Sequence, residues 1–155
     1  MEIQINNLQN DVSIDKKKVR ELIRRIIRLL RMRGRKELSF AFVDAETIAQ
    51  LNREYRGSDD VTDVLSFLFS PHNMEKDTER KVISGEIVIC PSVARDNCER
   101  FSTSLEEELA LLLIHGLLHQ LGYEDEEEEE EEREAMSTKQ DRILVALKSE
   151  GRIEI

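Results

Sequence analysis

Four short segments of the chain carry the residue pattern of β-strands. A strand turns successive side chains to opposite faces of a sheet, so alternation of apolar and polar residues predicts a strand. A short apolar run between turn residues predicts one as well. The predicted strands are Glu2–Asn6, Leu38–Val43, Val64–Phe69 and Gly85–Cys90.

Five other segments repeat their apolar residues every three or four positions, which is the period of an amphipathic helix. The first four predicted helices run from Asp15 to near Gly34, from Asp44 to the turn that begins at Arg56, from Pro91 to about Glu99, and from Ser104 to Gly122. The fifth follows the acidic run, and its inner side carries Met136, Ile143, Leu144 and Leu147. Residues 70–81 are polar, contain a proline and are interpreted as a loop. With 155 residues and neither an internal repeat nor a linker, residues 1–155 are predicted to form a single domain.

The fourth predicted helix has the clearest boundaries. Ser104 and Glu107 have the spacing of a capping box, in which a serine caps the helix and a glutamate lies three residues on. Gly122 is suited to end the helix, because glycine readily takes the left-handed conformation. The residues between are apolar on nearly every side, so this helix is expected to be buried.

Charge is distributed unevenly along the chain. The net charge is −10, but nine of the 33 acidic residues lie consecutively at Glu124–Glu132, which leaves 24 acids against 23 bases. Lys16–Lys36 contains eleven Lys or Arg residues and a single acid, Glu21. A net negative charge ordinarily argues against a nucleic-acid partner, but here a basic block near one end weakens that argument.

The N-terminal residues form neither a basic nor an apolar signal region, and the longest apolar run, Leu109–Ile114, is far too short to span a membrane. Two cysteines, Cys90 and Cys98, are too few for a disulfide framework or a four-cysteine metal site. These features favour a cytoplasmic protein with reduced thiols and no membrane partner.

The stretch HGLLHQLGYED places His115 and His119 one helical turn apart, on the same face of the fourth helix. Gly122 allows the chain to double back, so Asp125 could approach the same point. Three ligands with one open position are typical of a catalytic zinc site. Glu124 and Glu126 are rival third ligands, and simple packing of the histidines is the alternative interpretation.

Two nearby observations limit the chemistry. Zinc proteases of the His-Glu-x-x-His type have a glutamate directly after the first histidine as general base, and this chain has Gly116 there. Peptide hydrolysis by that mechanism is therefore disfavoured. The third histidine, His72, lies in the polar loop and is expected to be exposed and not a ligand.

The motif HGLLHQLGYED resembles the signature of the YbeY-type endoribonuclease family, the bacterial ribosomal RNA maturation factors. Three further stretches resemble that family in order and spacing: LNREYR followed by TDVLSF, GEIVI, and the late helix that begins near EAM. The resemblance implies an α+β fold, in which a mixed four-stranded sheet packs on helices and a buried central helix carries the metal-binding histidines.

The resemblance also implies functional residues. His115 and His119 correspond to two of the family's three zinc ligands, and Arg56 corresponds to its catalytic arginine; we also expect His115 to act in catalysis. The family's third ligand is usually a histidine, at the position of Asp125 here. Aspartate is an acceptable zinc ligand, but a more oxygen-rich site shifts the preference towards harder cations such as manganese.

The function that this implies is metal-dependent cleavage of single-stranded RNA in ribosomal RNA maturation and ribosome quality control. The implied partners are ribosomal RNA, the small ribosomal subunit and an assembly GTPase. Arg24, Arg25, Arg28 and Arg31 flank the apolar stripe of the basic helix, which could follow an RNA backbone, although a solvated helix face has the same composition. Of these, Arg24, Arg28 and Arg31 are the predicted RNA-binding residues. Two alternatives remain open: a metal-dependent hydrolase of another substrate, and a ribosome-assembly binding protein whose metal site is structural or empty.

Overall fold

The computed structural model describes residues 1–69, 82–123 and 130–155. Within these ranges the chain forms four strands and five helices, so every predicted element is present. The elements are β1 (Glu2–Asn7), α1 (Lys16–Leu29), β2 (Arg35–Phe42), α2 (Ala45–Arg56), β3 (Val64–Leu68), β4 (Val82–Ile89), α3 (Pro91–Phe101), α4 (Leu105–Gln120) and α5 (Glu130–Glu150).

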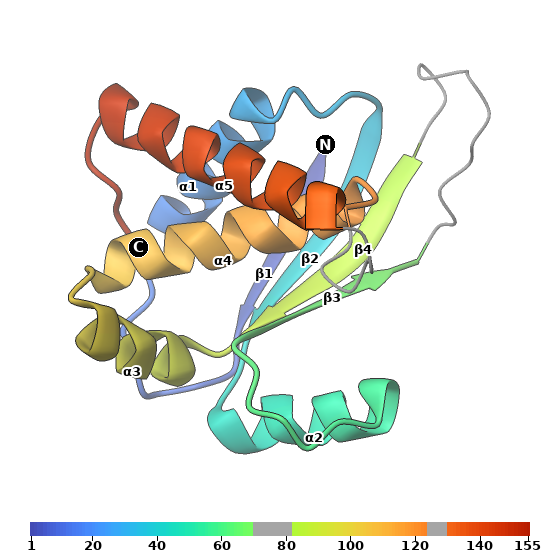
Figure 1. The fold of residues 1–155 in the computed structure, drawn as a ribbon, viewed down its shortest axis with the longest axis vertical. Helices are drawn as coiled ribbons and strands as arrows, with labels where there is room; N and C mark the ends of the chain where they lie inside the picture. The colour runs from blue at the N-terminus through green and yellow to red at the C-terminus, as the bar shows by residue number, and fades with distance from the viewer. Residues whose placement is uncertain (70–81, 124–129) are drawn as a thin grey trace.

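The four strands form one mixed sheet in the order β1-β2-β4-β3 (Figure 1). The strands β1, β2 and β4 run parallel to one another, and β3 pairs antiparallel with β4. The α+β fold with a mixed four-stranded sheet is therefore confirmed. Because β3 pairs with β4 alone in this order, it forms one edge of the sheet.

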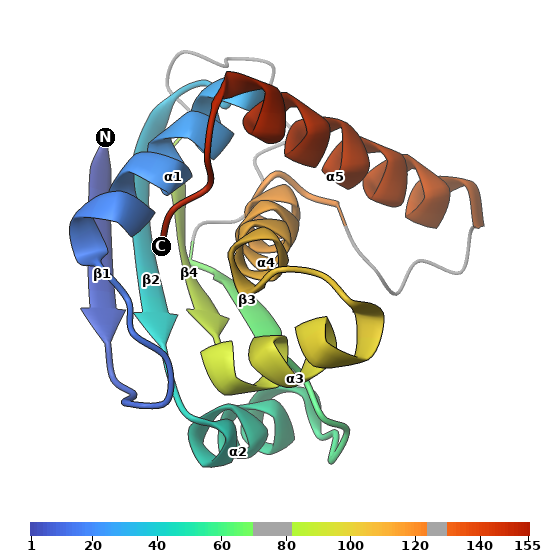
Figure 2. The same cartoon turned by 90° about the vertical axis from the view of Figure 1, so that its left-hand side faces the viewer.

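The two faces of the sheet carry separate hydrophobic cores. Phe40 and Phe42 belong to the large core under α1 and α4, whereas Ala41 and Val43 belong to a smaller core with Ile48 of α2. Neighbouring residues of a strand point to opposite faces, so α2 packs on the face opposite to α4. Figure 2 shows α1 and α4 along one side of the sheet, with α5 outside them.

The helix α4 is the buried centre of this arrangement. Nine of its residues are buried: Leu109, Ala110, Leu112, Leu113, Ile114, Gly116, Leu117, Leu118 and Gln120. It contacts β3 and β4 on one side, with α1, α3 and α5 around it. The prediction of a buried helix that carries the two histidines is confirmed. None of the helices in the described ranges is long and apolar enough to cross a bilayer.

Helix α1 ends earlier than predicted. The helix stops at Leu29 rather than near Gly34, and Arg31 takes a left-handed conformation with φ of 53°. The Arg31 amide donates to the Arg28 carbonyl and the Met32 amide to the Ile27 carbonyl, a hydrogen-bond pattern that closes a helix end. A left-handed residue other than glycine costs about 1–2 kcal/mol, and burial of the next side chain, Met32, is favourable by a similar amount.

The strand boundaries also differ from the predicted ones. Strands β2 and β4 each begin three residues early, and β3 ends one residue early at Leu68. The added starts pair with each other, since Arg35 lies opposite Val82 in the parallel ladder. Backbone hydrogen bonding therefore extends β2 and β4 beyond the residues whose apolar and polar pattern predicted a strand.

Side-chain oxygens cap α2 and α4 as the sequence indicates. Asp44 accepts from the Thr47 amide at 2.8 Å, and the hydrogen bonds from the Thr47 side chain and backbone lower the pKa of Asp44. Ser104 Oγ accepts from the Glu107 amide at 3.1 Å. The Glu107 carboxylate lies 2.9 Å from Lys148 Nζ of α5. The glutamate of the predicted capping box therefore forms an ion pair that joins α4 to α5.

Candidate metal centre

The histidine pair lies on a half-buried stripe of α4. His115 and His119 are both partly exposed, while the residues on either side of each are buried. The i, i+4 spacing stacks the two rings on one face of the helix. Their ring centroids are 4.7 Å apart with an interplanar angle of 75°. The two imidazoles therefore meet on one face of the helix, as the sequence predicts, and this face is partly exposed to solvent.

The facing atoms of the two rings are the nitrogens that usually bind metals. His115 Nε2 and His119 Nε2 are 3.1 Å apart. Two nitrogens that each lie about 2.05 Å from one tetrahedral zinc ion would be separated by about 3.3 Å. The spacing of the pair thus fits two ligands of one transition-metal ion, and imidazole suits zinc, copper, iron and nickel.

The predicted third ligand, Asp125, lies outside the described residues, as do Glu124, Glu126 and His72. Among the side chains that the structure describes, no group of three His, Cys, Asp or Glu residues could hold an ion. The described part of the site therefore contributes two nitrogens. The assignment of Asp125 stays a prediction.

The chain turns sharply directly after the second histidine. The Gly122 amide donates to the His119 carbonyl at 3.0 Å, and the Tyr123 amide donates to the Leu118 carbonyl at 3.1 Å. Gly122 has φ of 101°, a conformation that glycine adopts without strain. The predicted termination of the helix at Gly122 is confirmed.

Gly116 is a packing requirement of α4. A Cβ atom on this residue would lie 2.7 Å from Ile87 Cγ2 of β4, closer than real side-chain atoms approach. The residue after the first histidine therefore faces the sheet. A glutamate at this position has no space, so the absence of the zinc-protease base follows from the packing of helix on sheet.

Gln120 joins the C-terminal end of α4 to the edge strand β3, a role that sequence reasoning missed. Its side chain is fully buried, and Nε2 donates to Ser66 Oγ at 2.8 Å and to the Phe67 carbonyl at 3.0 Å. Ser66 Oγ in turn donates to the Gly116 carbonyl at 3.1 Å. The sequence offered one indication of this role, a glutamine at the end of the mostly apolar segment of the helix.

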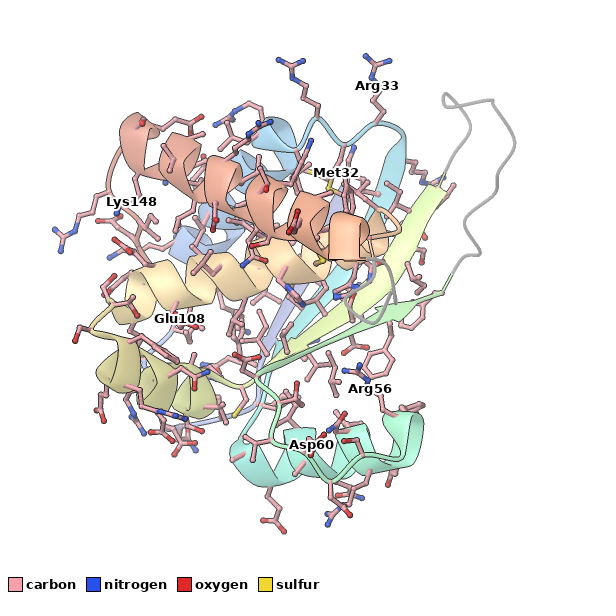
Figure 3. The ribbon with its side chains drawn as sticks, in the orientation of Figure 1. Met32, Arg33, Arg56, Asp60, Glu108 and Lys148 are labelled. Atoms are coloured by element: carbon pink, nitrogen blue, oxygen red, sulfur yellow. The ribbon has the colours of Figure 1, made fainter. Side chains whose placement is uncertain are left out.

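Arg56 occupies the last position of α2, whereas the sequence placed it in the turn, which begins instead at Gly57. Its side chain extends from the end of α2 towards β3 (Figure 3). The preceding residue, Tyr55, makes an edge-to-face contact with Phe67, with ring centroids 5.1 Å apart. Gln120 binds the Phe67 carbonyl from the other face of the sheet. Phe67 is therefore contacted both by the residue that precedes Arg56 and by the residue that follows His119.

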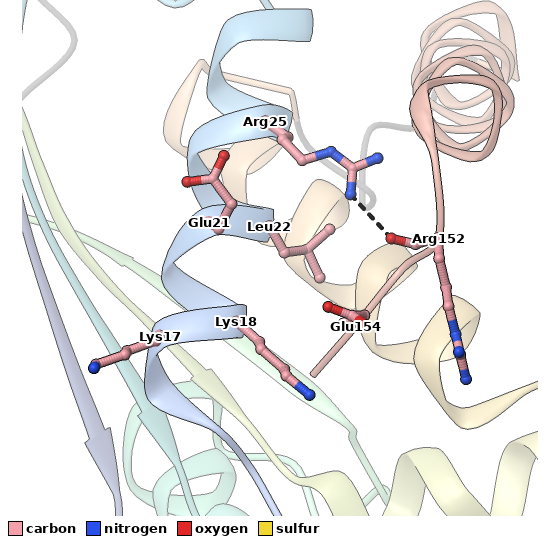
Figure 4. Close-up of a pocket in the computed structure, with 7 residues that line it drawn as sticks. All are labelled: Lys17, Lys18, Glu21, Leu22, Arg25, Arg152 and Glu154. Atoms are coloured by element: carbon pink, nitrogen blue, oxygen red, sulfur yellow. Dashed lines mark hydrogen bonds between the residues drawn. The ribbon is translucent and has the colours of Figure 1, made fainter.

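The basic helix is divided between structure and surface. Arg25 is largely buried, and its guanidinium donates to the Leu147 carbonyl at 2.8 Å and the Arg152 carbonyl at 3.4 Å. Figure 4 shows the contact between Arg25 and Arg152. It lies beside a hollow of about 270 Å³ that Lys17 and Lys18 help to line. Arg25 therefore holds the C-terminal segment in place.

The three arginines predicted to bind RNA lie at the surface. Arg24 and Arg28 are exposed on α1, and Arg28 lies 3.8 Å from a Glu150 oxygen. Arg31, also exposed, lies after the end of α1 rather than on it. Exposed pairs of this kind contribute about 0–1 kcal/mol, so they leave the arginines available to other anions. Binding of RNA by these residues stays a prediction.

A carboxylate with a perturbed pKa lies on the same side of α4 as the histidines. Partial burial raises the pKa of Glu108, and the nearby charge of Asp63 raises it further, while a hydrogen bond with Thr103 opposes both. Asp63 Oδ2 also accepts from Asn97 Nδ2 at 3.1 Å. Glu108 precedes His115 by two helical turns, which places it towards the opposite end of the helix.

Fold and site together define an α+β protein in which a buried helix presents a histidine pair beside the edge strand of a mixed sheet. The sequence profile of the family Endoribonuclease YbeY matches residues 4–148. The chain belongs to this family, which confirms the resemblance drawn from its motifs.

Individual relatives cover nearly the whole chain. Endoribonuclease YbeY of Syntrophus aciditrophicus is 37% identical over 147 residues, or 95% of this chain and 90% of the relative. The protein of that name from Persephonella marina is 39% identical over 147 residues, or 95% and 93%. The solution structure of TM1509 from Thermotoga maritima has a TM-score of 0.57 at 28% identity, and the match covers 96% of this chain and 93% of that one.

Proposed function

We propose that the protein is a metal-dependent endoribonuclease that cleaves single-stranded RNA in ribosomal RNA maturation and ribosome quality control. The observation that carries the proposal is the 3.1 Å approach of the two Nε2 atoms of His115 and His119. Membership of a family named for endoribonuclease activity supports RNA as the substrate. We place this activity in the cytoplasm, with the small ribosomal subunit and an assembly GTPase as partners.

We assign one zinc ion to His115, His119 and Asp125, with manganese as the alternative because of the carboxylate. A zinc ion held there would supply Lewis acidity, which polarises a phosphate oxygen and lowers the pKa of bound water to about 7. The residues of the chain hold and orient the reacting groups. His115 and His119 contribute neutral nitrogens, and Asp125 would contribute a negative oxygen.

Arg56 supplies the charge that phosphodiester cleavage needs. Its guanidinium is always protonated and matches two phosphate oxygens in a fork of parallel hydrogen bonds. Negative charge grows on the phosphate in the transition state, so a fixed cation beside it lowers the barrier.

The arrangement around β3 suggests the path of the substrate. Helices α4 and α2 approach this strand from opposite faces, at Ser66 and Phe67 respectively. A phosphate that contacts both the histidine pair and Arg56 would therefore lie across the open edge of β3. A single strand of RNA fits such an edge because its backbone is not held in a duplex.

The proposal is tested by metal content and RNA cleavage measured on the same preparations. Elemental analysis of the purified protein should find about one zinc or manganese ion per chain, and cleavage of a labelled single-stranded RNA should stop with a chelator and return with added metal. His115→Ala and His119→Ala should lose metal and activity, whereas the matched control His72→Ala should keep both. Equal cleavage by the parent with and without chelator would refute metal dependence.

The same preparations identify the third ligand and separate the alternatives. Asp125→Ala should lose most of the metal, Glu124→Ala and Glu126→Ala should retain it, and Asp125→His should bind zinc at least as well as the parent. Cleavage of peptides or small esters without RNA cleavage would favour the other hydrolase. Ribosomal association that survives His115→Ala, in a parent without nuclease activity, would favour the binding protein.

A further inference from the structure

Helix α5 turns one polar residue towards the histidine pair. Its inner stripe contains Met136, Ile143 and Leu147, which are all buried in the main core. Gln140 lies in the same stripe, because it follows Met136 by four residues and precedes Ile143 by three. An apolar side chain would continue the packing of α5 on α4 at this position, so the glutamine calls for a separate explanation.

Gln140 contacts the ring of His115 at the atom opposite to the proposed ligand atom. Gln140 Oε1 lies 3.1 Å from His115 Nδ1. An amide oxygen can only accept a hydrogen bond, so Nδ1 must carry the proton in this contact. A neutral imidazole has one N–H group, and its other nitrogen then carries a lone pair in place of a proton. In His115 that other nitrogen is Nε2, the atom that faces His119.

We infer that Gln140 is a positioning residue, which holds His115 in the tautomer whose Nε2 is available to a metal ion. The inference rests on the proposed function, since it assigns a role at the same metal site. Without an acceptor at Nδ1, the proton could reside on Nε2 and block the ligand atom. The hydrogen bond also fixes the rotation of the ring, and outer partners of this kind typically account for 10–100-fold of metal affinity.

The first test measures zinc affinity by competition with a chromophoric chelator. Gln140→Met keeps a long unbranched side chain but offers at most a weak acceptor, so zinc affinity should fall about 10–100-fold. Gln140→Glu restores an acceptor that cannot donate when ionised, so its affinity should stay within about threefold of the parent or exceed it. The matched control is Gln50→Met, which makes the same change at an exposed position of α2; its affinity should equal that of the parent.

The second test needs no metal. Nitrogen-15 spectra of the imidazole rings in the metal-free protein should show the His115 proton on Nδ1 in the parent and in Gln140→Glu. In Gln140→Met the proton should be shared with Nε2 or move to it. A merely structural role for Gln140 would change stability but would leave this distribution as it is in the parent.

Two results would overturn the inference. One is zinc affinity in Gln140→Met equal to that of the parent, and the other is a parent whose metal-free His115 carries its proton on Nε2. A parent that binds no zinc would refute the proposed function separately, because the ring spectra of the metal-free protein decide the tautomer without any metal.

Discussion

Replacement of Gly85 by alanine should destabilise the protein far more than a single added methyl group suggests. Gly85 lies in β4, between Leu38 of β2 and Leu68 of β3 in the sheet register. A Cβ atom here would clash with both the Phe67 carbonyl oxygen and Gln120 Oε1. The carbonyl belongs to the backbone of the neighbouring strand, so it cannot move without shifting β3.

The magnitude follows from the two contacts. Overpacking of a filled interior costs about 1–3 kcal/mol. If the amide of Gln120 is displaced, its hydrogen bonds to Ser66 and Phe67 are lost, at about 1 kcal/mol each. We therefore expect Gly85→Ala to lower the free energy of unfolding by about 3–5 kcal/mol. The melting temperature should fall by roughly 6–20 °C, at about 2–4 °C per kcal/mol for a chain of this size.

The assay is urea unfolding followed by far-ultraviolet circular dichroism, with Gly57→Ala as the matched control. Gly57 has φ of 64° and no atom within 4 Å of an added Cβ. That variant therefore carries the cost of the left-handed backbone without a clash, about 1–2 kcal/mol. In a Gln120→Ala background the cost of Gly85→Ala should shrink, because one of its two clashes is gone.

Two outcomes would contradict this reasoning. Gly85→Ala could prove no more destabilising than Gly57→Ala, which would mean that the strand moves aside at little cost. The effects of Gly85→Ala and Gln120→Ala could instead add exactly, which would mean that the methyl group and the amide do not compete for the same space.

Three further predictions concern the surface and the charges. Arg56→Ala should reduce RNA cleavage by at least tenfold while the free energy of unfolding changes by no more than about 1 kcal/mol, as for other exposed residues; parental cleavage rates would contradict its role. Reversal of Arg24, Arg28 and Arg31 to glutamate should weaken RNA binding and reduce the dependence of the affinity on salt concentration. If the affinity of the parent for RNA does not change with salt concentration, these arginines are merely solvated. Glu108→Gln should be more stable than the parent at pH 7, because a raised pKa means that the ionised carboxylate is disfavoured in the folded state. The difference in stability should disappear below pH 4.5, the ordinary pKa of glutamate, because Glu108 is then protonated in both the folded and the unfolded parent. Urea unfolding at pH 7 and pH 4 measures this difference. Equal stability of the two proteins at pH 7 would refute the assigned pKa direction.

The parts of this protein that local sequence determines were predicted well. The i, i+4 spacing of His115 and His119 brings two rings together on any helix, and the 3.1 Å approach of their Nε2 atoms agrees with it. Ser104 and Gly122 bound the same helix through hydrogen bonds to residues within a few positions. Such contacts depend on the backbone of one element alone, so periodicity and capping rules suffice to find them.

The parts that depend on tertiary contacts were missed or misplaced. Gln140 is separated from His115 by 25 residues, and the contact exists only because α5 packs on α4. The end of α1 was predicted near Gly34, but the helix ends at Leu29, Arg31 takes the left-handed conformation, and the following residue Met32 is buried in the core. Both errors arise because packing decides between conformations that local preference leaves close in energy.

Gly116 separates this site from that of the zinc proteases on physical grounds. Those enzymes place a glutamate, the general base, directly after the first histidine of the helix. Here the same position faces β4, where an added Cβ would lie 2.7 Å from Ile87 Cγ2, so the contact between helix and sheet leaves no space for a carboxylate. The charged group that we propose for phosphate binding is therefore on another element. Arg56, at the end of α2, would supply a permanent cation there, which suits a phosphate and cannot act as the base that peptide hydrolysis requires.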